Sequence, residues 1–336
     1  MKRLPLNLAT LYADLVQSAT FSTVLPGSVF TQTINGRVYL YATEKHGATR
    51  VQRYLGPVDA PDAIARADDI RRAGADAKVR RKTVSMLKRA GVPAPTLAMG
   101  RLMEGIANAG LFRNGIVLVG TGAYQVYSPV VGAALSHAAL STQDADLAAA
   151  SLAVTSEVKG QSLLDVLKRT DPTFIAQPNL NPRDPPRRFR SAAGFEVDVV
   201  TRYRTRADEE RAVVIPGLQC SAQPLRYLDY LIADPVSAVA LYGSGVPVVV
   251  PQPARYAVHK LIVAQVRANA SAKRRKDLVQ AKELIEVLSI SEPHAIDDAI
   301  ANARARGAKW KTNIDRSLRE LGLDSFAAAK SRRLPK

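Results

Sequence analysis

The chain has 336 residues, 47% of them hydrophobic, and its 47 lysines and arginines against 30 aspartates and glutamates give a formal net charge of +17. A chain of this length and composition can bury a sizeable core, in two domains or in one with extensions. Cys220 is the only cysteine, which excludes an internal disulfide or a thiolate metal cluster, and the four histidines have no zinc-binding spacing.

The positive charge favours polyanionic partners, and nucleic acid is the leading candidate. It is uneven, since residues 1–100 hold 15 lysines and arginines against 7 aspartates and glutamates, and residues 301–336 hold 10 against 3. No apolar stretch is long enough to cross a bilayer, and the first residues lead into no clear signal-peptide core. We therefore expect a cytoplasmic protein without a membrane partner.

The first predicted elements lie in a basic region. Residues 5–30 are expected to be helical at first and then irregular. Turns at Asn35-Gly36-Arg37 and at His46-Gly47-Ala48 frame two strand-like segments, which predicts a basic hairpin carrying Tyr39, Tyr41 and Tyr54. This is the composition of a small nucleic-acid-reading sheet, and a hairpin that only packs on the next helices is the alternative.

Two helices should follow the hairpin. Residues 61–90 are charged and helical, and Gly91-Val92-Pro93-Ala94-Pro95 ends the pattern, because a glycine closes the helix and prolines cannot continue it. The next helix is expected at residues 96–109.

A strand, a glycine turn and a helix are predicted next. Residues 115–119 are apolar and β-branched, Gly120-Thr121-Gly122 follows, and a helix should begin at Ala123. Glycine lets the backbone approach a phosphate, Thr121 can cap the helix or bind an oxygen, and the free amides of a helix N-terminus favour anions. A triphosphate could therefore rest at Gly120 and Thr121.

Three carboxylates lie on strand-like segments further along the chain. In Asp144-Ala145-Asp146 the spacing of two places both acids on one face of a strand. Asp198 lies between two valines, on the second of two strands paired around Ala193-Gly194, and an acid in that position should be paired, solvated or metal-bound. Oxygen ligands of this kind suit Mg²⁺, and two such ions could hold the attacking and leaving oxygens of a nucleotidyl transfer.

Taken singly, each motif is explained more simply as a solvated turn or a cap, but their order and strand context favour one site. This order resembles the DNA-polymerase-β-like nucleotidyltransferase superfamily. More narrowly, residues 111–124 (LFRNGIVLVGTGAY) and 142–147 (TQDADL) are similar to a prokaryotic family of nucleotidyltransferase-fold proteins, over about residues 98–288. The resemblance implies that Asp144, Asp146 and Asp198 are catalytic metal ligands and that Gly120 and Thr121 contact phosphate.

Residues 161–168 should form a helix, residues 178–186 a proline-rich loop, and residues 253–264 an amphipathic helix. The resemblance implies that a lysine on a helix after the catalytic sheet reaches the triphosphate, and Lys260 is the first choice. The alternative is a lysine whose stem lines the helix edge while its charge stays in water. Three basic clusters are either nucleic-acid contacts or solvated faces: residues 187–190, 202–206 and 273–276.

We therefore predict an α+β protein. A nucleotidyltransferase-like mixed β-sheet core with flanking helices should occupy residues 98–250, after a basic N-terminal hairpin and helical region (1–97) and before a C-terminal helical region (251–336). The predicted activity is Mg²⁺-dependent transfer of a nucleoside monophosphate from an NTP to an acceptor hydroxyl, with Asp198 also able to help deprotonate that hydroxyl.

The basic surface favours an RNA end, such as a tRNA 3′ terminus, as the acceptor, while a protein hydroxyl or a small molecule stays open. The alternative from another class is a non-catalytic nucleic-acid-binding protein that retains the fold, against which the intact carboxylate set argues. The resemblance also leaves a toxin-like or defence role open, since members of the superfamily act in both. The sequence identifies no protein partner.

Overall fold

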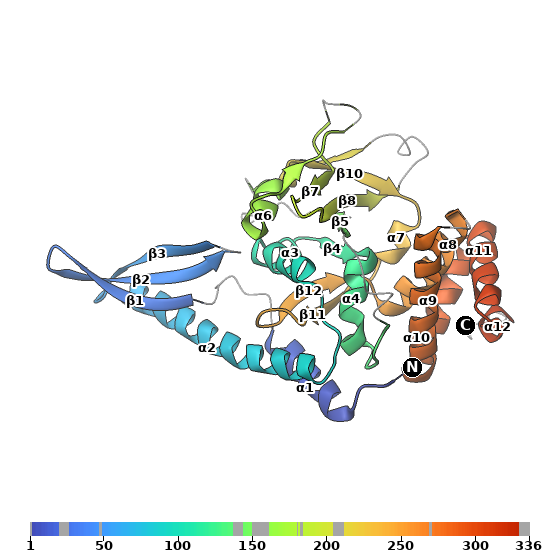
Figure 1. Cartoon of the computed structure of the whole chain (residues 1–336), viewed down its shortest axis with the longest axis horizontal. Helices are drawn as coiled ribbons and strands as arrows, with labels where there is room; N and C mark the ends of the chain where they lie inside the picture. The colour runs from blue at the N-terminus through green and yellow to red at the C-terminus, as the bar shows by residue number, and fades with distance from the viewer. Residues whose placement is uncertain are drawn as a thin grey trace, which may run out of the picture.

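The computed structural model describes residues 2–19, 27–46, 49–136, 144–149, 161–179, 181, 184–203, 212–268 and 271–328. They form a three-stranded sheet near the N-terminus, a larger mixed sheet, a two-stranded hairpin and a helical C-terminal part (Figure 1). The predicted mixed α+β class is therefore confirmed. No helix within these ranges is long and apolar enough to cross a membrane.

The N-terminal sheet has three antiparallel strands in the order β1 (Gly27–Ile34), β2 (Arg37–His46) and β3 (Thr49–Pro57). The predicted pairing of β2 with β3 is confirmed, but the expectation of an irregular segment before them is wrong in part, because β1 occupies it. Asn35 and Gly36 both have positive φ, 51° and 76°, as the two-residue turn of a tight hairpin requires. The other predicted turn, at residues 47–48, lies outside the described residues.

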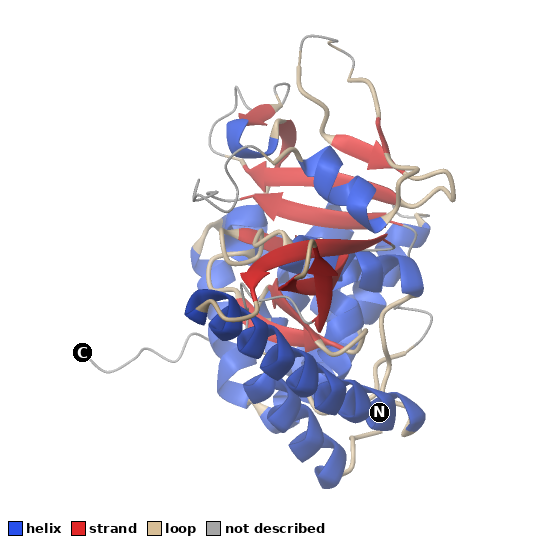
Figure 2. Cartoon of the chain, turned by 90° about the vertical axis from the view of Figure 1, so that its left-hand side faces the viewer, coloured by secondary structure: helices blue, strands red, loops and turns tan. Residues whose placement is uncertain are grey.

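Helix α2 (Pro61–Arg89) covers one face of this sheet. Leu40, Ala42 and Leu55 from the sheet pack on the helix side chains Ala63 and Ala67, and together they form a small core separate from the main one. The sheet and the start of α2 project from the rest of the molecule in Figure 1, and Figure 2, viewed from that side, shows α2 running along the sheet. The hairpin therefore packs on its helix, as one of the two alternatives expected. The opposite face of the sheet is not covered by α2.

The two predicted helices of this region are confirmed. Helix α2 ends one residue before the predicted limit, and Gly91 follows with φ +84°. Helix α3 (Leu97–Asn108) begins after Thr96, whose hydroxyl oxygen accepts a hydrogen bond from the Met99 amide at 3.4 Å. The chain enters the main sheet from the end of α3.

The main sheet follows the order β4-β5-β8-β10-β9. Strand β4 is antiparallel to β5, β5 and β10 are both parallel to β8, and β9 is antiparallel to β10. Two short strands, β6 and β7, continue it beside the first half of β8. The sequence predicted the strands up to β8 that carry the motifs, but not β9 or β10. The bounds are β4 (Ile116–Val119), β5 (Asp144–Ala149), β6 (Ile175–Ala176), β7 (Arg188–Arg190), β8 (Glu196–Arg202), β9 (Val213–Ile215) and β10 (Cys220–Leu225).

Helices and the hairpin of β11 (Val236–Ala240) and β12 (Val246–Val250) surround this sheet. The remaining helices are α1 (Leu6–Ser18), α4 (Gly120–Val130), α6 (Leu163–Thr170), α7 (Leu228–Leu231), α8 (Pro253–Val266), α9 (Ala272–Ser291), α10 (Pro293–Ala305), α11 (Ala308–Glu320), α12 (Asp324–Ala328) and the 3₁₀ helix η2 (Pro216–Leu218). The helices predicted at 161–168 and 253–264 correspond to α6 and α8.

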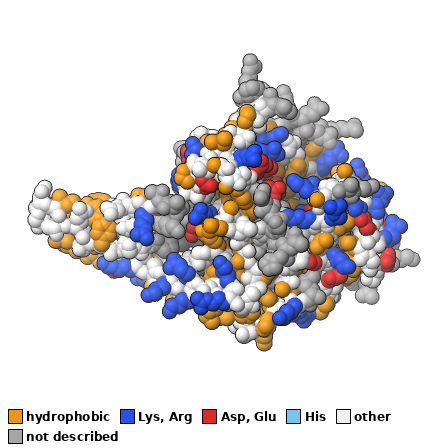
Figure 3. Space-filling view, in the orientation of Figure 1, with side chains coloured by type: hydrophobic (Ala, Val, Ile, Leu, Met, Phe, Trp, Pro, Cys, Tyr) orange, Lys and Arg blue, Asp and Glu red, His pale blue; other side chains and the backbone are white. Residues whose placement is uncertain are grey.

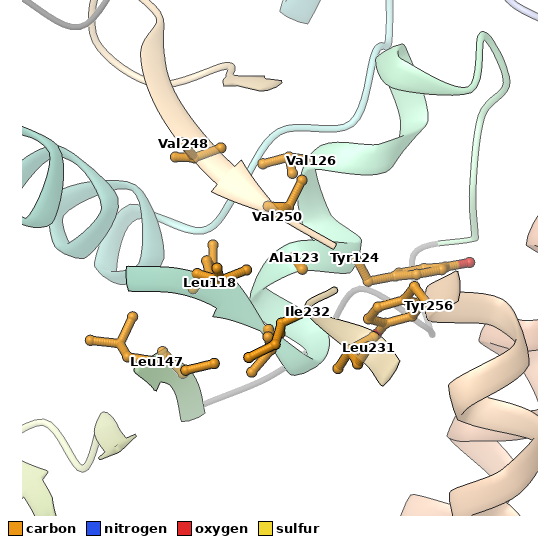
Figure 4. Close-up of a cluster of buried hydrophobic side chains, with 14 of the residues drawn as sticks. Leu118, Ala123, Tyr124, Val126, Leu147, Leu231, Ile232, Val248, Val250 and Tyr256 are labelled. Atoms are coloured by element: carbon orange, nitrogen blue, oxygen red, sulfur yellow. The ribbon is translucent and has the colours of Figure 1, made fainter. Parts of the chain in front are cut away.

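One hydrophobic core joins the sheet to the C-terminal helices. Figure 4 shows Leu118 of β4, Tyr124 of α4, Val250 of β12 and Tyr256 of α8 meeting in this core. The rings of Tyr124 and Tyr256 stack with centroids 6.0 Å apart. Because buried apolar area stabilises in proportion to its extent, this shared core fixes α8, and α9 packed beside it, next to β4 and β5.

Candidate active site

The strand register brings two of the three predicted acids directly side by side. Strand β5 lies between β4 and β8, and Asp146 is aligned with Val119 on one side and with Asp198 on the other. Asp144 is two residues earlier on β5, so it shares the face of Asp146. The residues between them, Ala145 on β5 and its partner on β8, are buried on the opposite face.

A fourth carboxylate belongs to the same face. Glu196 of β8 is aligned with Asp144 and lies two residues before Asp198, and it forms a salt bridge with Arg190 at 3.7 Å. Glu196 was not predicted as a site residue, although the same alternation that places Asp198 outward also places Glu196 outward. Four acids therefore follow two adjacent strands.

Gly120 forms the junction between β4 and α4, and it lies against Asp146. Its φ of +61° belongs to the left-handed region, and a Cβ atom there would overlap the Asp146 carboxylate. Two constraints therefore require glycine at this position: the left-handed backbone conformation and the close approach of the Asp146 carboxylate. The helix begins at Gly120 itself and not at residue 123, so the turn is tighter than predicted.

Thr121 and the first turn of α4 follow this junction. No side chain in the described part of the chain caps the start of α4, which leaves its first backbone amides to interact with a ligand. The Tyr256 hydroxyl on α8 donates to the Gly120 carbonyl oxygen at 2.9 Å and lies 2.9 Å from the Gln280 side-chain amide oxygen on α9. The glycine junction is thus held by a buried tyrosine from the C-terminal helices.

Cations also face Asp198 and Asp144. The Arg188 guanidinium on β7 donates to Asp198 at 2.7 Å, and the Lys273 ammonium at the start of α9 lies 3.6 Å from Asp144. Both basic residues belong to clusters that the sequence analysis assigned to nucleic-acid contacts or solvated faces. In the structure they belong to the carboxylate site, because the neighbouring strand β7 and the helix α9 carry them there.

Lys260 is buried, with 7% of its surface exposed, so the solvated alternative does not describe it. Its ammonium donates to Asp277 at 2.6 Å, and Arg267 donates to the other oxygen of the same carboxylate at 2.6 Å. The ammonium also lies 5.2 Å from the centre of the Tyr256 ring. Lys260 is therefore the centre of a buried ion-pair network directly behind the glycine junction.

The electrostatics of the site centre on Asp146. Burial, with the charges of Asp144 and Asp198 beside it, raises the pKa of Asp146 to about 6, while Lys260 and Lys273 act in the opposite direction. On α9, burial lowers the pKa of Lys276, partly offset by its attraction to Asp144. Like charges held this closely favour binding of a cation among them.

The Mg²⁺ ion predicted from the sequence can be compared with the side chains at the site. Within the described ranges, no three histidine, cysteine or carboxylate side chains lie close enough together, as they stand, to hold a metal ion. Asp144, Asp146 and Asp198 are oxygen donors of the type that Mg²⁺ prefers, on one face of adjacent strands, and the raised pKa of Asp146 marks an excess of negative charge. They fit the ion in chemistry and strand position, and a cation shared by all three would replace Arg188 and Lys273 as their partners.

Other titratable groups are less suited to chemistry. Burial raises the pKa of the Cys220 thiol to about 12, which keeps it protonated and unreactive. His259 on α8 has its pKa lowered to about 3, first by burial and then by Lys260, and its buried Nδ1 has no hydrogen-bond partner among the described residues. Burial therefore suits both residues to packing and not to proton transfer. His137 and residues 204–206 of a basic cluster lie outside the described residues.

Two signals in the sequence could have revealed the residues that were missed. Tyr256 and Lys260 are four positions apart on one helix, and Lys273 and Lys276 are three apart on another, so each pair shares a helix face. On strand β8, the alternation of side chains places Glu196, two residues before Asp198, on the same face. What no local pattern provides is the parallel alignment of β5 with β8.

A nucleotidyl-transfer fold has these features: a mixed β-sheet with flanking helices, a glycine junction that leads into a helix, and carboxylates on two adjacent strands. A family model described as nucleotidyltransferase matches residues 98–305, more than half of the chain. The chain therefore belongs to this nucleotidyltransferase family. Comparisons with curated proteins and with solved structures gave no significant match.

Proposed function

We propose that this protein transfers a nucleoside monophosphate from an NTP to an acceptor hydroxyl in a Mg²⁺-dependent reaction. One observation carries the proposal: Asp146 and Asp198 are aligned on adjacent parallel strands, with Asp144 on the same face and Gly120 against the Asp146 carboxylate. Nucleotidyl transfer gains mainly from positioning and from neutralising phosphate charge, and this arrangement supplies groups for both.

Asp144, Asp146 and Asp198 would hold the metal, which supplies charge neutralisation and orients the phosphates. Arg188 and Lys273 already face two of these acids. With the carboxylates holding a metal, Arg188 and Lys273 would be available to pair with the phosphate oxygens. Such an exchange would keep Asp144 and Asp198 paired with positive charge in both states, which would lower the cost of binding a highly charged ligand.

The phosphate groups would bind at Gly120, Thr121 and the start of α4, where the backbone amides lack a side-chain cap. Lys273 and Lys276 from α9 supply positive charge at the same place. Lys260 contributes charge from behind the junction, and its direct contact with a phosphate would require it to leave Asp277. In this proposal Lys260 therefore acts on the site mainly through the field it adds near Asp146.

The acceptor proposed is the 3′-hydroxyl of an RNA. Its oxygen would attack the α-phosphorus, the bond to the bridging oxygen of pyrophosphate would break, and pyrophosphate would leave. The hydroxyl proton would pass to a carboxylate, for which Asp198 is the candidate. The excess of positive charge on the chain, +17, supports an acceptor that is itself a polyanion.

A non-catalytic nucleic-acid-binding protein is the second candidate. The salt bridges of Asp198 with Arg188 and of Asp144 with Lys273 favour it, because they satisfy two acids without any metal. Under this alternative the carboxylates would only position basic side chains.

The test is incubation of the protein with each α-labelled NTP, Mg²⁺ and total cellular RNA. We expect label in RNA from wild type and none from Asp144→Ala/Asp146→Ala. The matched control is Asp297→Ala/Asp298→Ala, two exposed acids on α10, which should label like wild type. Label that survives in the Asp144→Ala/Asp146→Ala protein, or no label with any NTP while RNA binding persists, would reject the proposed activity in favour of the second candidate.

A further inference from the structure

The second face of the N-terminal sheet carries a row of aromatic rings. Phe30 of β1, Tyr41 of β2 and Tyr54 of β3 are aligned across the three strands, and Tyr39 is two residues before Tyr41 on the same face. Ring centroids are 5.7 Å apart between Phe30 and Tyr41 and 5.5 Å apart between Tyr41 and Tyr54. We refer to these four residues as the aromatic face.

These rings do not form part of the core under the sheet. The small core on α2 uses the alternate residues Leu40, Ala42 and Leu55. Tyr54 is 54% exposed, although large aromatic side chains are ordinarily well covered. Figure 3 shows apolar side chains at the surface of the projecting part of the molecule that β1–β3 form.

Positive charge lies at both ends of the aromatic face. Arg37 is two residues before Tyr39 at the turn end of β2, and Arg50 is four residues before Tyr54 at the start of β3; both are exposed. Residues 27–57 hold four lysines and arginines against one acid, and residues 61–89 of the supporting helix hold nine against four. Hydrogen-bonding side chains share the face with the rings: Ser28, Gln32, Thr43 and Gln52.

We infer that the aromatic face binds single-stranded RNA, with bases stacked on Tyr41 and Tyr54 and phosphates near Arg37 and Arg50. Exposed rings on a sheet with basic side chains beside them are what an unpaired strand requires, because every base has a stacking face and every linkage carries a charge. A duplex keeps its bases stacked on each other and leaves none for the rings. A protein partner would find the apolar patch flanked by the exposed arginines Arg37 and Arg50.

This inference rests on the proposed function in one respect, the choice of RNA, since RNA is the acceptor proposed for the carboxylate site. It adds a second contact region for that substrate, on a part of the chain that lies before residues 98–305 of the family match. The sheet would hold the body of the strand while its end is at the carboxylates.

The test measures fluorescence anisotropy of a labelled oligouridine of about 20 nucleotides, longer than the ~4–16 nucleotides that one such surface covers. Full-length protein is titrated without NTP at about 0.1 M salt. Tyr54→Ala should weaken binding about 5- to 140-fold, which is ~1–3 kcal/mol per stacked base at about 1.4 kcal/mol per tenfold. Tyr54→Phe keeps the ring and should bind within about twofold of wild type.

Matched controls separate the aromatic face from general effects. Ile290→Ala removes an apolar side chain that is 69% exposed at the end of α9, and its RNA affinity should equal that of wild type. Thermal unfolding of Tyr54→Ala should remain cooperative, since the ring is outside the core. Equal RNA affinity of wild type and Tyr54→Ala, or tighter binding of duplex DNA than of oligouridine, would overturn the inference. Dimerisation that Tyr54→Ala abolishes, without RNA binding, would assign the face to a protein contact and overturn it too.

The same proteins distinguish this inference from the proposed function. If both hold, Asp144→Ala/Asp146→Ala binds oligouridine like wild type but transfers no label, and Tyr54→Ala raises the KM for RNA while kcat changes little. Binding through Tyr54 with no label transfer by wild type would reject only the activity. Label transfer with the same KM in wild type and Tyr54→Ala would reject only the aromatic face.

Discussion

The main sheet and the N-terminal sheet each bury one face against helices, but the chemistry of the other face differs. In the main sheet the second face of β5 and β8 carries carboxylates, and each of the described acids there has a cation or another acid beside it. In the N-terminal sheet the second face carries aromatic rings, of which Tyr54 is more than half exposed. The function proposed for the carboxylate face depends on the pairing of charges, and the function proposed for the aromatic face depends on the exposed area of its rings.

This difference implies different responses to substitution. A buried charge that loses its partner destabilises strongly, and an acid that is lost from a metal site removes a ligand outright. A ring that is lost from a stacking surface leaves its neighbours in place and weakens binding by degrees. We therefore expect all-or-none effects in the main sheet and graded effects in the N-terminal one.

The largest effect should come from Asp198→Asn. Loss of this acid should lower the rate of label transfer by about 10³-fold, because metal stabilisation of the transition state contributes several kcal/mol and about 1.4 kcal/mol corresponds to tenfold. Glu196→Gln, on the same face of the same strand and paired with Arg190, is the matched control and should cost less than about tenfold. Equal losses in the two variants would show that the face acts only through its total charge.

The next effect concerns the ion-pair network behind the site. Asp277→Asn leaves Lys260 and Arg267 without their shared carboxylate, and we expect a loss of about 3–5 kcal/mol in the free energy of unfolding. Asp68→Asn breaks an exposed pair with Arg71 on α2, under the N-terminal sheet, and should cost less than about 1 kcal/mol. Urea unfolding measures both. A small loss for Asp277→Asn would mean that Lys260 is free to move to a ligand.

Two glycines sharpen the same comparison. Gly120→Ala must adopt a φ of +61° and displace the Asp146 carboxylate, so we expect a loss of about 2–4 kcal/mol together with loss of transfer. Gly36→Ala, with φ +76° in the hairpin turn of the N-terminal sheet, meets no atom of the described residues within 4 Å and should lose only about 1–2 kcal/mol. Similar losses in both would contradict the close approach of Gly120 to Asp146.

The pH dependence of stability tests the charge excess. The folded pKa of Asp146, about 6, is above its ordinary value of 3.8, so the folded state holds this proton more tightly than the unfolded state. Stability therefore falls as pH rises from about 4 to 6, and the penalty is complete above that range. Without metal, Asp146→Asn should be more stable than wild type by up to about 3 kcal/mol at pH 7 and equal to it near pH 3.5. Asp297→Asn is the control, and its stability relative to wild type should not change with pH. An Asp146→Asn protein that is less stable than wild type at pH 7 would contradict the raised pKa of Asp146.

The smallest effect belongs to the N-terminal sheet. Arg50→Ala should reduce the slope of log affinity against log salt for oligouridine by about 1, since one phosphate contact is lost. Lys78→Ala, exposed on α2 away from the aromatic face, should leave the slope unchanged. A slope that changes equally in both variants would indicate diffuse attraction by the whole basic region.

Local patterns in the sequence predicted most of the elements that build the site. Strand β4, the glycine junction, the alternation of Asp144 and Asp146, and the position of Asp198 all follow from short-range rules, because side-chain direction repeats every two residues in a strand. Strand β1 was missed because its polar residues give no alternating pattern, and pairing with β2 determines its conformation.

Long-range contacts could not be predicted in the same way. The alignment of Asp146 with Asp198 joins strands about fifty residues apart, and the approach of Lys273 to Asp144 depends on the packing of α8 and α9 on the sheet. The buried pair of Lys260 with Asp277 also needs two helices in contact. The roles that the sequence suggested for Asp144, Asp146, Asp198, Gly120, Thr121 and Lys260 stay predictions until activity is measured.

The most direct test of the central claim is the Mg²⁺ dependence of label transfer from α-labelled NTP to RNA, compared between wild type and Asp146→Asn. We expect transfer by wild type that EDTA abolishes and Mg²⁺ restores, and transfer about 10³-fold slower in Asp146→Asn, although its fold and its affinity for oligouridine are unchanged. Transfer by Asp146→Asn at the wild-type rate, or transfer by wild type that is insensitive to EDTA, would contradict the account.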